Sequence, residues 1–179
     1  MSYLPRDRLN NRFALILAEA VSSYLVVFPL PDLRALTMAA VMRQFLSCFP
    51  KPSQLLSDYG VEFSSIFTTE LQKYGITQHE GISQRSQSQG SAKLGVKLVK
   101  MTLNKMIGME SNQGRDYWTK MIPHVVQRIN STHPYQMKLS RIHLLFSPLY
   151  HLNETLLVPN PMLLQAKCYE DLSHQQGSL

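Results

Sequence analysis

The chain has 179 residues, of which 44% are hydrophobic and 17% charged, and its formal net charge is +6. This length suits one domain with a well-buried core, and the apolar content excludes a disordered chain. The positive charge favours an acidic partner such as nucleic acid, although a basic soluble protein without such a partner has the same charge balance.

The two cysteines, Cys48 and Cys168, stand far apart in the sequence. This spacing excludes a paired Cys/His zinc finger and a dense disulfide framework, and it is typical of an intracellular protein. The longest apolar runs cover 13–18 and 24–30, well short of the roughly 20 residues that cross a bilayer. We therefore expect no membrane insertion, and no signal peptide is expected either.

The N-terminal part predicts a hairpin followed by a helix. Residues 13–18 and 24–29 are short apolar runs with a brief polar connection between them, as in two adjacent buried strands. Over 33–49 the apolar residues recur at helical spacing, and Pro50 and Pro52 follow them. Proline does not continue a helix, so the helix should end there.

The rest of the chain predicts an alternation of strand and helix and then helices alone. The expected elements are a strand over 54–57 that ends at Asp58, a short helix over 65–74, a strand over 76–82, a polar loop over 84–90, and helices over 91–109, 115–130 and 141–149. Such an order predicts an α/β domain in which a mixed sheet is flanked by helices. We place this domain at residues 1–150, followed by a C-terminal tail over 151–179 that should fray from 173.

A motif at the end of the third strand suggests a family. Residues 57–63 read Ser-Asp-Tyr-Gly-Val-Glu-Phe and resemble the Ser/Thr-Asp-Asn-Gly-x-Glu-Phe segment of retroviral and LTR-retrotransposon (Ty3/gypsy-like) integrase cores. A further similar segment lies upstream at 16–24, and others follow the motif in the family's order and spacing at 74–76, 87–93, 118–123, 128–132 and 146–148. The resemblance covers about residues 13 to 150. It implies an RNase H-like fold, a role in DNA integration and a nuclear place of action.

The resemblance also implies a catalytic site, from which this sequence departs. The family's core holds two Mg²⁺ or Mn²⁺ ions with two Asp and one Glu, and these ions activate the nucleophile and stabilise the leaving oxygen. The second Asp corresponds to Asp58, whereas Lys93 stands at the position of the Glu. An ammonium group cannot ligate a divalent cation and repels it.

The first catalytic Asp of the family lies on a strand before the one at 13–18. By spacing it should fall at or before Tyr3, where the sequence has none, so we expect that strand to be truncated. Asp7 is a weak substitute, because its neighbours are typical of a turn. We therefore predict a pseudoenzyme that keeps Asp58 alone as a metal ligand and holds no ion stably.

The helix over 91–109 carries a basic face. Lys93, Lys97, Lys100 and Asn104 recur at offsets that place them on one side of a helix. The matching helix of the family lies against DNA, so the resemblance implies that Lys97 and Lys100 neutralise phosphates of DNA or RNA. A solvated helix face would show the same pattern.

The polar loop before this helix adds Arg85, Gln87 and Gln89 as candidates for hydrogen bonds to nucleic acid. An ordinary solvated loop is the alternative interpretation. The histidines show no metal-ligand spacing, and we interpret them as core or surface residues.

Three hypotheses about function remain open. The first is an inactive integrase-derived domain that binds nucleic acid. The second is a working polynucleotidyl transferase in which a neighbour such as Glu80 replaces a missing carboxylate. The third is a structural or dimerisation module, since family cores form homodimers through helices like those expected at 33–49 and 91–109.

Overall fold

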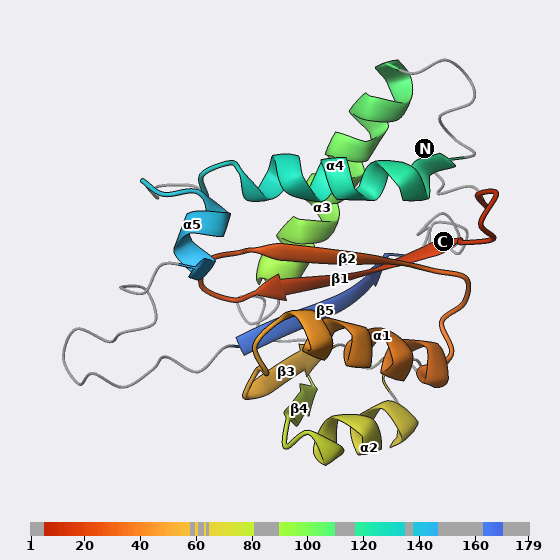
Figure 1. Ribbon diagram of the computed structural model, residues 1–179, viewed down its shortest axis with the longest axis vertical. Coiled ribbons are helices and arrows are strands. Elements are labelled where there is room, and N and C mark those ends of the chain that lie inside the picture. The colour runs from red at the N-terminus through yellow and green to blue at the C-terminus, as the bar shows by residue number, and fades with distance from the viewer. Residues whose placement is uncertain are drawn as a thin grey trace, which may run out of the picture.

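The computed structural model describes residues 6–57, 60, 63, 65–80, 90–109, 117–134, 138–146 and 163–169. Within them a five-stranded mixed sheet has the order β2–β1–β5–β3–β4 and is flanked by helices (Figure 1). The strands are β1 (Phe13–Glu19), β2 (Leu25–Leu30), β3 (Gln54–Ser57), β4 (Thr77–Glu80) and β5 (Leu163–Tyr169). The helices are α1 (Ala35–Cys48), α2 (Ser65–Lys73), α3 (Gly90–Met109), α4 (Trp118–Asn130) and α5 (Arg141–Phe146).

The predicted hairpin is confirmed as the antiparallel pair β1 and β2, with Phe13 opposite Leu30 and Ala18 opposite Leu25. Its turn is held by the buried carboxylate of Glu19. One oxygen of this group accepts hydrogen bonds from the backbone N–H of Val21 and from the hydroxyl of Ser22. A buried carboxylate needs such donors, because its charge is costly away from water.

The predicted helix over 33–49 is also confirmed, with slightly narrower ends. Phe49, which precedes Pro50, has extended backbone angles, because the proline ring disfavours the helical region for the residue before it. The remaining expected elements up to α5 agree with the structure in type and order. The strand that we expected over 76–82 is described only as far as Glu80.

The expected C-terminal tail is wrong for one segment. Residues Leu163–Tyr169 form β5, which lies inside the sheet between β1 and β3. It runs antiparallel to β1 and parallel to β3, and Leu164 is almost fully buried. The prolines nearby and the polar end of the chain suggested a tail, but a central strand is stabilised by ladders on both sides. The described residues before β1, 6–12, form no strand.

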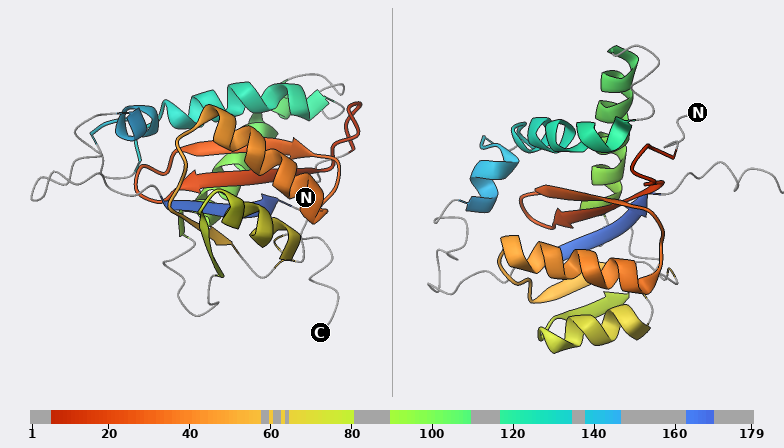
Figure 2. Two further views of the ribbon diagram at one scale, coloured as in Figure 1. Left: turned by 60° about the horizontal axis from the view of Figure 1, so that its bottom comes forward. Right: turned by 45° about the vertical axis from the view of Figure 1, so that its right-hand side comes forward.

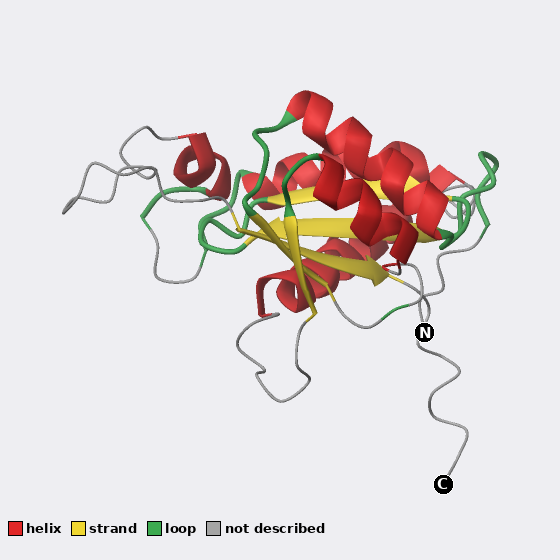
Figure 3. Cartoon of the chain, turned by 90° about the horizontal axis from the view of Figure 1, so that it is seen from below, coloured by secondary structure: helices red, strands yellow, loops and turns green. Residues whose placement is uncertain are grey.

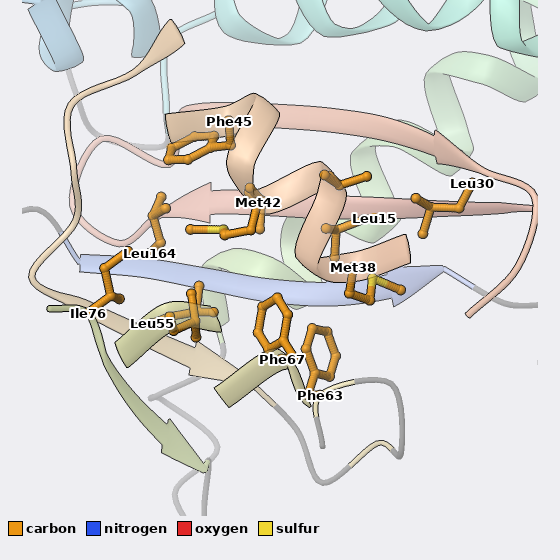
Figure 4. Packing of buried hydrophobic residues seen from close by; sticks show 13 residues of the cluster. Leu15, Leu30, Met38, Met42, Phe45, Leu55, Phe63, Phe67, Ile76 and Leu164 are labelled. Carbon is orange, nitrogen blue, oxygen red and sulfur yellow. The ribbon is translucent and has the colours of Figure 1, made fainter. Parts of the chain in front are cut away.

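The sheet separates two hydrophobic layers because successive strand residues face opposite sides. In β1, Leu15 and Leu17 belong to the cluster that packs against α1 and α2, part of which Figure 4 shows. Ala14, Ile16 and Ala18 belong to the cluster that packs against α3 and α4. Figure 2 shows α1 and α2 on one side of the sheet and α3 on the other, and Figure 3 shows helices on both sides of the strands.

Close packing of α3 on the sheet depends on Gly95. A Cβ atom at this position would lie 2.8 Å from Cδ2 of Leu25 and 3.3 Å from Cγ2 of Ile16. Since the first of these distances is shorter than van der Waals contact allows, a larger residue would force the side chain of Leu25 or the helix itself to move. Gly95 therefore allows α3 to lie this close to β1 and β2.

Candidate nucleic-acid interface

Helix α3 has one face on the sheet and one in solvent. Ala92, Val99 and Leu103 are buried at 1–2% exposure, while Lys93 and Lys97 are exposed. Lys100 and Asn104 are also exposed and fall on the same side of the helix as these lysines. We call the group of Lys93, Lys97, Lys100 and Asn104 the lysine face.

The start of α3 is fixed by two hydrogen bonds from different elements. The hydroxyl of Ser91 donates to the carbonyl oxygen of Ala20 at 3.2 Å, just after β1. The backbone N–H of Ala92 donates to the side-chain oxygen of Gln165 on β5 at 3.1 Å. The first N–H groups of a helix have no partner within the helix. Gln165 supplies such a partner, and it thereby holds the first turn that carries Lys93.

The charge of α3 is uniformly positive. Its sequence contains four lysines and no acidic residue, so no acid within the helix neutralises the lysine face. The fourth lysine, Lys105, is exposed as well but lies outside this face, because its angular position differs from that of Lys97 and Lys100. The positive end of the helix dipole, at its N-terminus, adds to the charge of Lys93.

Several predicted site residues fall outside the part of the chain that the structure describes. These are Asp58, Arg85, Gln87 and Gln89. The strand that leads to Asp58 is described, and its last residue, Ser57, is fully buried. The hydroxyl of Ser57 accepts a hydrogen bond from the side-chain amide of Gln78 at 2.9 Å, which joins the ends of β3 and β4.

The register pairs Glu80 at the end of β4 with Ser57 at the end of β3. The side chain of Glu80 lies outside what the structure describes, whereas the hydrogen bonds of Ser57 show which face of the sheet it occupies. Ser57 is bonded to Gln78, whose side-chain oxygen accepts a hydrogen bond from Thr68 on α2. This face is therefore covered by α2, whereas Lys93 starts a helix on the opposite face.

Two further acids, Asp7 and Glu19, have structural partners. Asp7 is buried, and its carboxylate accepts hydrogen bonds from the N–H groups of Leu9 and Asn11 and from the hydroxyl of Thr119. It thus closes the predicted turn and links it to α4. Glu19 holds the hairpin turn. Both carboxylates accept hydrogen bonds from groups around them.

A pair of divalent ions needs several anionic oxygens. Among the described residues, no group of three or more His, Cys, Asp and Glu side chains has an arrangement that suits a metal ion. The first turn of α3 offers Lys93 and no acid. The four described histidines, His79, His124, His133 and His143, are all exposed.

Two functional features were missed by sequence reasoning. Gln165, which holds the start of α3, lies in the segment that we assigned to a tail, and the alternation of Leu164, Ala166 and Cys168 along that segment is the signal that identifies a strand. Phe146 at the end of α5 is 57% exposed, and its ring makes an edge contact with that of Tyr24 at 5.9 Å between ring centres. Trp118 is fully buried.

Comparison with known proteins supports the fold. The structure is similar to the catalytic core domain of BIV integrase, with a TM-score of 0.62 and 19% sequence identity, over 75% of this chain and 86% of that one. No family model and no curated protein matches the sequence. The chain therefore has the integrase-like, RNase H-like α/β fold that the motif at 57–63 implies.

None of the helices in the described residues is both long and apolar enough to cross a membrane.

Proposed function

We propose that this chain is an integrase-core-like domain of LTR-retroelement, Ty3/gypsy-like origin, which binds nucleic acid and does not transfer DNA strands. The observation that carries the proposal is the lysine face of α3, which is exposed along a helix without acids. Phosphates of DNA or RNA are the partners that such a surface attracts, because each contact releases counterions from the nucleic acid.

The geometry of α3 suits this role because its buried side and its first turn are both fixed to the rest of the domain. Val99 and Leu103 anchor it in the core, and Ser91 and Ala92 fix its first turn. A helix fixed in this way presents Lys93, Lys97 and Lys100 without a further cost of ordering the backbone on binding. Arg85, Gln87 and Gln89, just before α3 in the sequence, remain candidates for additional contacts.

The binding test compares two charge reversals of equal size. Lys97→Glu/Lys100→Glu changes the lysine face, while Lys51→Glu/Lys105→Glu changes two exposed lysines elsewhere. Both lower the formal charge from +6 to +2. Affinity for a fluorescent DNA duplex is measured by anisotropy across a salt series. We expect the first variant to lose on the order of tenfold affinity at about 0.1 M salt and its salt slope to fall by up to about 1.8. Equal losses in both variants would show that affinity depends on the net charge of the chain and not on the position of the lysine face.

The proposed inactivity follows from the residues that stand at the family's metal-ligand positions. The resemblance places Asp58 and Lys93 at two of the family's three ligand positions. Two divalent ions beside one carboxylate and one ammonium group lack the anionic oxygens that hold them and are repelled. We therefore propose that Mg²⁺ and Mn²⁺ are not held here as in the family.

A strand-transfer assay with Mg²⁺ or Mn²⁺ tests the inactivity. The unaltered chain should show no product above a reaction without protein. Turnover that Asp58→Asn abolishes would overturn the proposal, because it would show that Asp58 works with carboxylates not considered above. Asp7→Asn and Glu80→Gln would then identify which acid is used.

A homodimer is the second candidate, and exposed apolar residues on the outer helices favour it. Leu94 and Met101 on α3 are 43% and 47% exposed, and Leu36 on α1 is 67% exposed. Light scattering on the unaltered chain and on Leu94→Glu/Met101→Glu tests this pairing, with the exposed Leu139→Glu as a control. A dimer that only the double variant disrupts supports pairing through α3, and a monomer at all concentrations rejects it.

A further inference from the structure

The segment before β1 and the start of α4 each bring a cation to the ring of Tyr117. The guanidinium carbon of Arg8 lies 4.7 Å from the centre of this ring, and the ammonium nitrogen of Lys120 lies 4.8 Å from it. Both distances fall within the roughly 6 Å over which an aromatic face attracts a cation. Figure 1 shows the segment before β1 and the start of α4 at the same end of the domain. Two cations that are far apart in the sequence are therefore close neighbours in the fold.

The turn that carries Arg8 is fastened to the first turn of α4 by hydrogen bonds. One carboxylate oxygen of the buried Asp7 accepts hydrogen bonds from the backbone N–H groups of Leu9 at 2.9 Å and Asn11 at 2.8 Å. The other oxygen accepts one from the hydroxyl of Thr119 on α4. The side-chain amide of Asn11 donates to the same hydroxyl at 3.3 Å. The backbone on both sides of Tyr117 is thus fixed before any ligand binds, which lowers the cost of binding.

The charge of these two segments is positive. Arg8 and Lys120 are exposed, and α4 contains no acidic residue. Among the described residues, the carboxylates that form ion pairs are those of Asp32 and Glu70, so no described acid neutralises either cation. The oxygens of Asp7 are occupied by the donors named above. The two further cations of the segment before β1 are also exposed, and they are Arg6 and Arg12.

Cations gathered in this way repel one another, and a polyanion that contacts several of them removes the repulsion. Arg115 and Asp116, which precede Tyr117 in the sequence, have opposite charges and leave this balance unchanged. Arginine offers a planar fork of donors to a phosphate, while lysine offers a point charge. The pair Arg8 and Lys120 therefore suits a ligand that carries phosphate groups.

We propose that Arg8, Tyr117 and Lys120, which we call the Tyr117 cluster, form a second contact surface for nucleic acid. In this surface Arg8 and Lys120 bind phosphate groups of the backbone, and Tyr117 is a positioning residue that restrains both cations. The inference rests on the proposed nucleic-acid binding and adds a surface at the start of α4, on elements other than the helix of the lysine face. Contacts with the backbone of this kind are independent of sequence and sensitive to salt.

The first test measures the affinity of the full chain for a fluorescent DNA duplex across a salt series. Arg8→Gln/Lys120→Gln is compared with Lys51→Gln/Arg128→Gln, which also removes one arginine and one lysine from exposed positions. We expect the first variant to lose on the order of tenfold affinity at about 0.1 M salt and its salt slope to fall by up to about 1.8. The melting temperature of each variant verifies folding. Equal losses in the two variants would overturn the inference, because position would then not matter.

The outcomes separate this surface from the proposed function. If Lys97→Glu/Lys100→Glu weakens DNA binding and Arg8→Gln/Lys120→Gln does not, the lysine face stands and the Tyr117 cluster is wrong. If only Arg8→Gln/Lys120→Gln weakens it, the cluster stands and the lysine face is wrong. If neither pair matters, both are wrong. Binding of the parent to anionic lipid vesicles but not to DNA would overturn the choice of nucleic acid as the ligand.

The role of Tyr117 is tested by two substitutions that leave every charge in place. Tyr117→Phe keeps the aromatic face and should bind DNA as the parent does. Tyr117→Leu removes the face, so both cations lose their restraint, and affinity should fall by roughly threefold. Equal affinity of the two variants would overturn the positioning role of the ring.

A second measurement uses the unaltered chain and requires no substitution. Lysine acetylation is followed by mass spectrometry with and without duplex DNA. DNA should slow the modification of Lys120 and leave that of Lys51, an exposed lysine outside both surfaces, unchanged. An unchanged rate at Lys120 under conditions in which DNA is bound would overturn the inference.

Discussion

The contact between α4 and the edge strand β2 depends on one buried amide, and its removal should cost about 3 kcal/mol of folding free energy. The side chain of Asn130 accepts a hydrogen bond from the backbone N–H of Leu25 at 2.9 Å and donates one to the carbonyl oxygen of the same residue at 2.8 Å. Asn130 is 3% exposed and Leu25 1%. Asn130→Ala leaves both backbone groups of Leu25 buried without a partner, at roughly 1–3 kcal/mol each before relaxation.

The measurement is thermal and urea unfolding of the full chain. A loss of about 3 kcal/mol corresponds to a fall of roughly 6–12 °C in melting temperature for a domain of this size. Gln127→Ala is the matched control, because Gln127 is exposed on the same helix and alanine is a good helix former. If Asn130→Ala lowers the melting temperature no more than Gln127→Ala, the bidentate contact with Leu25 contributes nothing and the reasoning is wrong.

Three further substitutions test other polar contacts. Arg141→Ala should lower the free energy of unfolding by about 2 kcal/mol, because the guanidinium of Arg141 donates hydrogen bonds to the carbonyl oxygens of Ile129 and Thr132 at the end of α4. Urea unfolding measures this loss, and Arg141→Lys should restore part of it. Glu19→Ala should cost about 2 kcal/mol by the same measurement, since the hairpin turn loses its acceptor; an unchanged midpoint would count against the turn's dependence on Glu19. Gln165→Leu should speed hydrogen exchange at the Ala92 amide by about tenfold with little change at Val99, and equal protection in both proteins would argue against the anchor.

Most elements up to α5 were predictable because their signals are local. The run at 13–18 and the helical spacing over 33–49 each lie within a short window, and Pro50 marks a boundary by its own chemistry. The exposure of Lys93, Lys97 and Lys100 was predictable for the same reason. A helix repeats every 3.6 residues, so spacing alone sets which residues share a face.

The position of β5 was not predictable in this way, because its partners lie at the other end of the chain. Lys167 pairs with Ile16, and Leu164 pairs with Glu19. The pattern of the segment shows that it suits a strand but contains no information on which strands it pairs with. The same applies to the buried amides of Asn130 and Gln165, whose burial depends on backbone groups that only the fold brings near them.

The central place of β5 links the C-terminal segment to the proposed binding surface. In the described sheet, β1 and β3 are joined only through β5, and Gln165 on β5 holds the first turn of α3. Loss of this strand would separate the hairpin with α3 from β3, the strand that leads to Asp58. Because the lysine face begins at that first turn, its geometry requires β5. Nucleic-acid binding by a chain cut after α5 should therefore be weaker than that of the full chain, even though Lys97 and Lys100 remain present.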